Sequence, residues 1–268
     1  MFKNHTLNTL RLLQVCAIAL FAALPAVGHA DSITLTGTIR DFNSWGTTSN
    51  GVAGHIDFEN PCCGDDKNIT QATLGLDGKP ILNGSHWSVN SAASFYQWYH
   101  DDPTVNMSAA ISLTLNQISP TTYQYSSNSF FPIDGQLLNQ SACCGHNYGF
   151  TTEFHTLFNY QSGNNDTFAF SGDDDVWVFI NNQLAIDLGG VHGAEAASVS
   201  LNAIANAFGL SDGNNYTLDI FQAERHTSGS NFTMTTSLQL QSVPEPESYA
   251  LLLAALGILA ATRRRRVA

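Results

Sequence analysis

Three consecutive carboxylates, Asp173, Asp174 and Asp175, stand directly before the apolar segment 176–180 and suggest cation chemistry. Adjacent carboxylates repel one another unless a cation or a hydrogen-bond network offsets their charge. Calcium accepts several oxygen ligands at about 2.3 to 2.6 Å in a flexible geometry. Two neighbouring aspartates could therefore face one ion if the backbone between them turns sharply. The cluster predicts a calcium site at Asp173 and Asp174, and a solvated acidic loop is the alternative.

Further ligand candidates lie in turns and at predicted strand ends. We expect Asp175, Asp187 and His192 as additional metal or ligand contacts, while Glu224 and His226 are weaker candidates. For each histidine, a ring hydrogen-bonded to a backbone carbonyl is the alternative, and Glu224 could simply support a sheet edge. None of them has the His-Glu-x-x-His spacing of helical zinc sites. A glycosidase needs two carboxyl groups held about 5 to 10 Å apart, and no motif selects such a pair, so we expect no catalytic residues.

Aromatic side chains in the N-terminal half offer a second candidate for ligand binding. Trp45, Trp87 and the run at 95–100 could stack on sugar faces, with Asp101 nearby to bond hydroxyl groups. Core packing is the ordinary role of aromatic residues in a β-sandwich. We expect it for most of these rings and for Trp177.

Short runs of alternating apolar and polar residues must position these side chains. Turns rich in Gly, Asn, Asp and Ser separate the runs, which predicts strands, and only 201–210 predicts a helix. The chain is therefore expected to be all-β, with an antiparallel β-sandwich fold. A boundary near Pro132 is conceivable, although we favour one domain. The predicted strands are 33–39, 109–115, 154–160, 167–170, 176–180, 216–223 and 232–240.

The N-terminus predicts export. Lys3 and Arg11 precede an apolar stretch at 12–27, and the small residues Gly28 and Ala30 suit a signal peptidase. Residues 1–30 are therefore expected to be a cleaved signal peptide, with a buried helix as the alternative.

The C-terminus predicts a short membrane segment. A helix over the apolar run 249–261 would rise about 20 Å, less than the roughly 30 Å of a bilayer core. Four arginines after it would stay in the cytoplasm and leave the body outside. A permanent tail anchor is the alternative. The arginines are Arg263, Arg264, Arg265 and Arg266.

The remaining body, 31–242, holds only four of the basic residues but 20 of the 22 acidic ones. Nucleic-acid binding needs a basic surface, so this function is excluded, whereas an acidic body attracts divalent cations. Calcium is the cofactor that we expect.

Two vicinal cysteine pairs remain after removal of the signal peptide, and an even number in an exported chain predicts disulfides. Adjacent cysteines rarely bridge each other, so two cross-links between the Cys-Cys-Gly turns are expected, with the connectivity open. A four-thiolate zinc site is the alternative, although zinc motifs usually separate their paired cysteines. The cysteines are Cys62, Cys63, Cys143 and Cys144.

The C-terminal stretch resembles the PEP-CTERM sorting signal of Gram-negative bacteria. Pro244, Glu245 and Pro246, the apolar run and the basic tail occur in the family's order. The resemblance implies processing by a membrane-embedded exosortase and delivery of 31–242 to the cell surface or to an exopolysaccharide matrix.

The body resembles the fibro-slime domain, a family near the protective-antigen lectin-like domains. The resemblance rests on Gly172 to Val176, Asp187 to His192, Ala223 to Thr227 and Ser230 to Phe232. In calcium-dependent lectins of the wider group, two aspartates joined by a cis peptide hold calcium and sugar hydroxyls complete its shell. By position these are Asp173 and Asp174, although Asp175 stands where the lectin-like pattern commonly has glycine.

These observations favour a noncatalytic surface or biofilm-matrix protein that contacts extracellular polysaccharide or another matrix component through calcium. A purely structural matrix protein stabilised by calcium is the second hypothesis. A secreted carbohydrate-active enzyme is the third.

Overall fold

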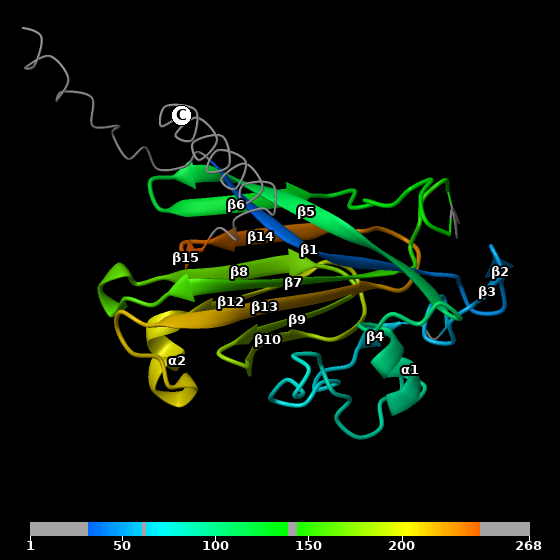
Figure 1. The fold of residues 1–268 in the computed structure, drawn as a ribbon, viewed down its shortest axis with the longest axis horizontal. Coiled ribbons are helices and arrows are strands. Elements are labelled where there is room, and N and C mark those ends of the chain that lie inside the picture. The colour runs from blue at the N-terminus through cyan, green and yellow to red at the C-terminus, as the bar shows by residue number, and fades with distance from the viewer. Residues whose placement is uncertain (1–31, 61–62, 139–143, 242–268) are drawn as a thin grey trace, which may run out of the picture. The chain divides into compact units, whose positions relative to one another are not determined.

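The computed structural model describes residues 32–60, 63–138 and 144–241, in which an 11-stranded antiparallel sheet is the main element. The strands follow the order β10-β9-β13-β7-β1-β5-β6-β14-β8-β12, with β15 on β7. The end strands β10 and β12 contact each other, so the sheet nearly closes on itself. In Figure 1, β5 and β6 lie on one side of the body and β9 and β10 on the other. The predicted all-β antiparallel fold is confirmed.

The strands of this sheet include all seven predicted from alternation. Strands β6, β10 and β12 were not predicted. The bounds are β1 Ser32–Phe42, β5 Asn106–Ser119, β6 Thr122–Ser127, β7 Phe150–Asn159, β8 Thr167–Gly172, β9 Asp175–Ile180, β10 Gln183–Leu188, β12 Glu195–Ser200, β13 Asn215–Glu224, β14 Phe232–Thr236 and β15 Gln239–Leu240.

Short elements connect and flank the sheet. The predicted helix is α2, which ends at Gly209, whose φ of 68° suits a residue without a Cβ. Figure 1 shows α1 and α2 at opposite ends of the body. The remaining elements are α1 Ala92–Gln97, α2 Leu201–Phe208, the 3₁₀ turn Ser162–Asn164 and the two-residue strands β2 Thr48–Ser49, β3 Val52–Ala53, β4 Gly64–Asp65 and β11 Gly190–Val191.

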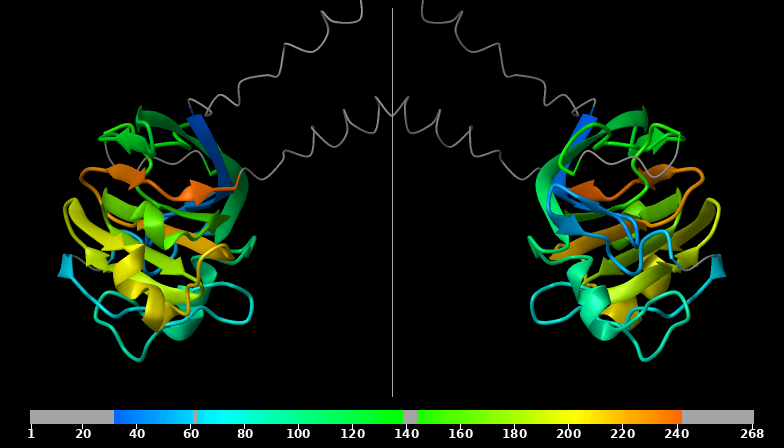
Figure 2. Two further views of the ribbon diagram at one scale, coloured as in Figure 1. Left: turned by 90° about the vertical axis from the view of Figure 1, so that its left-hand side faces the viewer. Right: turned by 90° about the vertical axis from the view of Figure 1, so that its right-hand side faces the viewer.

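Strand β9 is buried on both faces and separates two hydrophobic cores. Val176, Val178 and Ile180 belong to the core enclosed by the sheet. Trp177 and Phe179 belong to a second core, which residues between β1 and β5 cover. Strand β14, orange in the end views of Figure 2, closes the first core between β6 and β8.

Helix α1 supplies much of the second core. It begins with a capping box in which Ser91 and Ser94 satisfy each other's backbone amides. Phe95 and the following Trp98 and Tyr99 are buried. Core packing therefore accounts for most of the aromatic run, and only Tyr96, 56% exposed, keeps an open ring.

Strands on both sides of Pro132 share the main sheet, since β1 pairs with β7 and β6 pairs with β14. Cys63 and Cys144 each take part in a disulfide bond. Cys62 and Cys143 lie outside the described residues, so cross-linking between the two turns stays a prediction. The predicted signal peptide and sorting segment also lie outside them. Within the described ranges, no helix is long and apolar enough to cross a membrane.

Candidate cation-binding site

The sheet register brings two connections together at the acid cluster. Asp173 and Asp174 join β8 to β9, and residues 225–231 join β13 to β14. Because β14 pairs with β8 and β13 pairs with β9, the connection at 225–231 runs beside the two aspartates. The peptide bond between Asp173 and Asp174 is cis, as the resemblance implied.

Backbone and amide donors from 225–231 hold both aspartates in place. Asn231 donates its backbone N–H to Asp173 Oδ1 and its Nδ2 to Oδ2, the latter at 2.6 Å. The Oδ2 atom of Asp174 accepts the N–H groups of Arg225 at 2.8 Å and His226 at 2.9 Å. Burial raises the pKa of Asp174 well above its ordinary value, although the charge of Arg225 opposes this rise. The donors fix the direction of both carboxylates without neutralising them.

Asp175 is engaged elsewhere, in contrast to the expectation that it would contact a metal or ligand. Arg225 Nε lies 2.6 Å from its Oδ2 and Arg225 Nη2 lies 3.1 Å from its Oδ1, which also accepts the Gly190 N–H at 2.7 Å. Both partners of this ion pair are fully buried. The guanidinium also lies over the ring of Trp98, 4.5 Å from its centroid. Asp175 thus anchors the Arg225 side chain, which forms its ion pair with Asp175 rather than with the neighbouring acids.

Glu224, at the end of β13, is the unexpected member of the site. Its side chain is fully buried, and neither carboxylate oxygen has a hydrogen-bond partner among the described residues. The Ser230 hydroxyl nearby donates to the carbonyl of Phe130 at 2.8 Å. Burial and then the charges of Asp174 and Asp173 raise the pKa of Glu224 well above its ordinary value. The charges of both aspartates therefore act on a buried carboxyl group.

The other predicted ligands lie outside this group. Asp187 accepts hydrogen bonds from Trp177 Nε1, Gly189 N and Asn68 N, which makes it a turn-forming residue. The ring nitrogens of His192 face the carbonyls of Gly193 and Leu188, as its alternative interpretation predicted. His192 also forms a separate cluster with Asp65 and Glu195, in which Lys67 Nζ lies 2.7 Å from Glu195.

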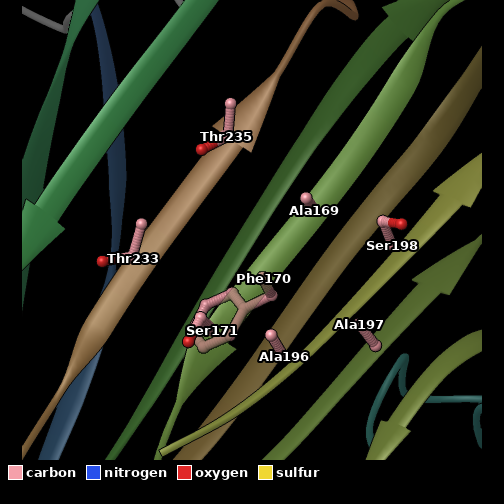
Figure 3. Close-up of a pocket in the computed structure, with 8 residues that line it drawn as sticks. All are labelled: Ala169, Phe170, Ser171, Ala196, Ala197, Ser198, Thr233 and Thr235. Atoms are coloured by element: carbon pink, nitrogen blue, oxygen red, sulfur yellow. The ribbon is translucent and has the colours of Figure 1, made fainter.

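A shallow hollow of about 350 Å³ lies on the outer face of β8, β12 and β14. Figure 3 shows its small side chains along the three strands, among them Thr233, Ser171 and Ala196. Every residue that lines it is uncharged. This hollow therefore lacks the ligands of a cation site. Its lining consists of Ala169, Phe170, Ser171, Ala196, Ala197, Ser198, Thr233 and Thr235.

The chain is similar in sequence to proteins of Dictyostelium discoideum. The chain is 38% identical over 200 residues to protein psiQ of Dictyostelium discoideum, covering 69% of this chain and 20% of psiQ. It is 36% identical over 226 residues to protein psiD of the same organism, covering 79% and 42%. The chain thus spans less than half the length of either relative.

Among solved structures, the PA14 domain of the MpAFP antifreeze protein is 11% identical, with a TM-score of 0.33, over 84% of this chain and 90% of that one. The fibro-slime resemblance is not confirmed under that name. Residues 140–250 match the PA14 domain, and residues 242–266 match the PEP-CTERM protein-sorting motif, so the predicted sorting signal is confirmed and the body carries a region similar to PA14 domains.

Proposed function

We propose that this chain is an exported surface or matrix protein of a Gram-negative bacterium and that its body binds carbohydrate, or another matrix component, through calcium. The PEP-CTERM match supports export and processing by an exosortase. The PA14 match supports a binding role rather than a catalytic one. Asp173, Asp174 and Glu224 would hold the ion, with no catalytic residue required.

The buried, unpartnered carboxylate of Glu224 is the observation that carries this proposal. An ionised carboxylate removed from water without donors is costly, and either a proton or a charge of opposite sign can compensate it. Arg225, the residue after Glu224, already pairs with Asp175. A divalent cation that prefers hard oxygen ligands would supply the compensating charge. Calcium tolerates the irregular geometry that three side chains from two connections provide.

Two groups of residues would then have different roles at the site. The two aspartates and Glu224 bind the ion, while Asn231 and the backbone at 225–226 keep the aspartates oriented. Hydroxyl groups of a sugar would replace water in the remaining coordination positions. Each site would bind sugar weakly, and many copies on one surface would raise the overall affinity for the polysaccharide.

A structural role for calcium is the second candidate function, and burial favours it. Asp173 and Asp174 are each only 4% exposed and Glu224 is fully buried, so an ion held by all three would leave little room for a sugar. In this case calcium would stabilise the connection at 225–231 and the matrix component would bind elsewhere or not at all.

Thermal unfolding of 31–242 with intact disulfides, in calcium and in chelator, tests the cation site. We expect calcium to raise the unfolding midpoint of the wild type and to have no effect on the double variant Asp173→Asn with Asp174→Asn. Asp212→Asn, an exposed acid before the other end of β13, is the matched control and should respond like the wild type. An equal response of all three proteins would show that calcium acts elsewhere.

A glycan array in calcium and in chelator separates the two candidate functions. Calcium-dependent retention that the double variant loses supports recognition through the ion. A thermal unfolding midpoint that rises with calcium, without retention of any glycan, supports the structural role. Release of soluble products from a polysaccharide would instead indicate an enzyme.

A further inference from the structure

The connection at 225–231 is held from outside by Glu59, which is distant in sequence. Thr227 donates its N–H to Glu59 Oε1 at 2.9 Å and its hydroxyl to Oε2 at 3.4 Å. In return, Glu59 donates its own N–H to the carbonyl of Arg225 at 2.7 Å. These contacts join the connection to the segment before β4.

The backbone of Glu59 is committed to this arrangement. Its φ of 58° lies in the left-handed region, which residues with a Cβ adopt infrequently. The carboxylate is 19% exposed, and His226 Nε2 lies 3.6 Å from its Oε2. Glu59 also adds to the negative field that raises the pKa of Glu224, after burial and the charges of Asp174 and Asp173. It therefore holds the connection that follows Glu224.

Glu59 holds a point of the connection between the residues that orient the two aspartates. Arg225 and His226 donate to Asp174 immediately before Thr227, and Asn231 donates to Asp173 immediately after the turn. A release of Thr227 would free the backbone between these two sets of donors. Residues that orient metal ligands without touching the metal typically change affinity by about 10 to 100-fold when mutated.

We propose that Glu59 is a positioning residue of the cation site, an inference that rests on the proposed function. Its carboxylate fixes Thr227, and through it the donors that orient Asp173 and Asp174. The segment before β4 thereby sets the calcium affinity of a site built by β8, β9 and β13.

Calcium titration calorimetry of the wild type, Glu59→Ala, Glu59→Gln and Thr227→Val tests this proposal. We expect Glu59→Ala to weaken calcium binding about tenfold or more. Glu59→Gln keeps an acceptor for the Thr227 N–H and should lose less, as should Thr227→Val, which keeps the N–H donor. Asp212→Asn removes an exposed acid that contacts Ser162 and not the connection, and it should retain wild-type affinity.

Hydrogen exchange in chelator provides a readout that stability alone would not move. We expect Glu59→Ala to accelerate exchange at the Thr227 amide while amides in the middle of β13 remain protected. Equal calcium affinities of wild type and Glu59→Ala would overturn the positioning role and leave the cation site intact. An equal loss in Glu59→Gln and Glu59→Ala would also overturn it, because the charge rather than the hydrogen bond would then matter. Absence of binding by the wild type would overturn both proposals.

Discussion

At the residue scale, the role of an acid is decided by its partner rather than by its neighbours in sequence. Asp174 and Asp175 are adjacent, yet the first faces backbone amides and the second an arginine. Glu224 precedes that arginine, and its carboxylate oxygens have no hydrogen-bond partner in the described part of the chain. The sequence shows the three adjacent acids but cannot assign these roles, because the Asp175–Arg225 contact joins positions 50 residues apart.

Removal of the Glu224 charge gives the sharpest prediction at this scale. In chelator at pH 8, we expect Glu224→Gln to increase the free energy of unfolding by about 1 to 3 kcal/mol, because an amide can donate to Asp173 or Asp174 where a carboxylate repels them. The same variant should lose the calcium response. Urea unfolding with and without calcium measures both effects, and a destabilised variant that still responds to calcium would exclude Glu224 as a ligand.

His155 predicts a pH dependence of stability that is independent of the cation site. Burial lowers its pKa, but hydrogen bonds and charges from Asp219 and Glu153 outweigh this effect and raise it to about 9. Lys79 and Arg40 also contact Glu153. Because the folded-state pKa exceeds the unfolded value of 6.5, the stabilisation is complete below pH 6.5 and is lost as the pH rises through about 9.

The imidazole of His155 is 42% exposed, so solvent screens these pairs. We expect about 1 kcal/mol of stabilisation at pH 6 relative to His155→Gln. The difference between the two proteins should vanish by about pH 10. Chemical unfolding in chelator across this range measures it, and a difference that is constant with pH would assign the loss to packing alone.

At the element scale, alternation predicted most of the strands that bury large side chains, but it missed β10, which buries Ile186 and Leu188 in the first core. Strand β12 is composed mainly of small residues, and β6 carries only two tyrosines toward the core, so neither produces a strong apolar period. Helix α1 was missed because its core residues Phe95, Trp98 and Tyr99 belong to a short aromatic run that equally suited an exposed binding surface. The burial of β9 on its second face decides between these roles, and that contact is tertiary.

Helix α1 offers a matched pair of substitutions for the second core. Phe95→Ala should destabilise the protein by about 3 to 5 kcal/mol, because it removes a buried ring that contacts Trp98 and Trp177. Tyr96→Ala, the next residue, should cost no more than about 0.5 kcal/mol, because its ring is exposed and contacts chiefly His100. Urea unfolding measures both. Comparable losses would mean that α1 is stabilised by its surface rather than by the core.

At the scale of the whole molecule, charge and number of copies decide what the body can bind. The acidic excess of 31–242 repels polyanions over a Debye length, about 8 Å at physiological ionic strength. Calcium would neutralise only the charges at its own site. The proposed function therefore favours neutral polysaccharides, with any acidic polysaccharide retained better as salt screens the repulsion.

Dense display of the body should convert weak single-site binding into retention of a polymer. On beads that carry few copies we expect little capture of a neutral polysaccharide, and on densely coated beads a rise in apparent affinity of about 100-fold or more, since the second contact is made at high effective concentration. Chelator, or the double variant Asp173→Asn with Asp174→Asn at the same density, should abolish the gain. Capture that is proportional to density and indifferent to chelator would instead place polysaccharide binding on a surface remote from the carboxylates of β8, β9 and β13.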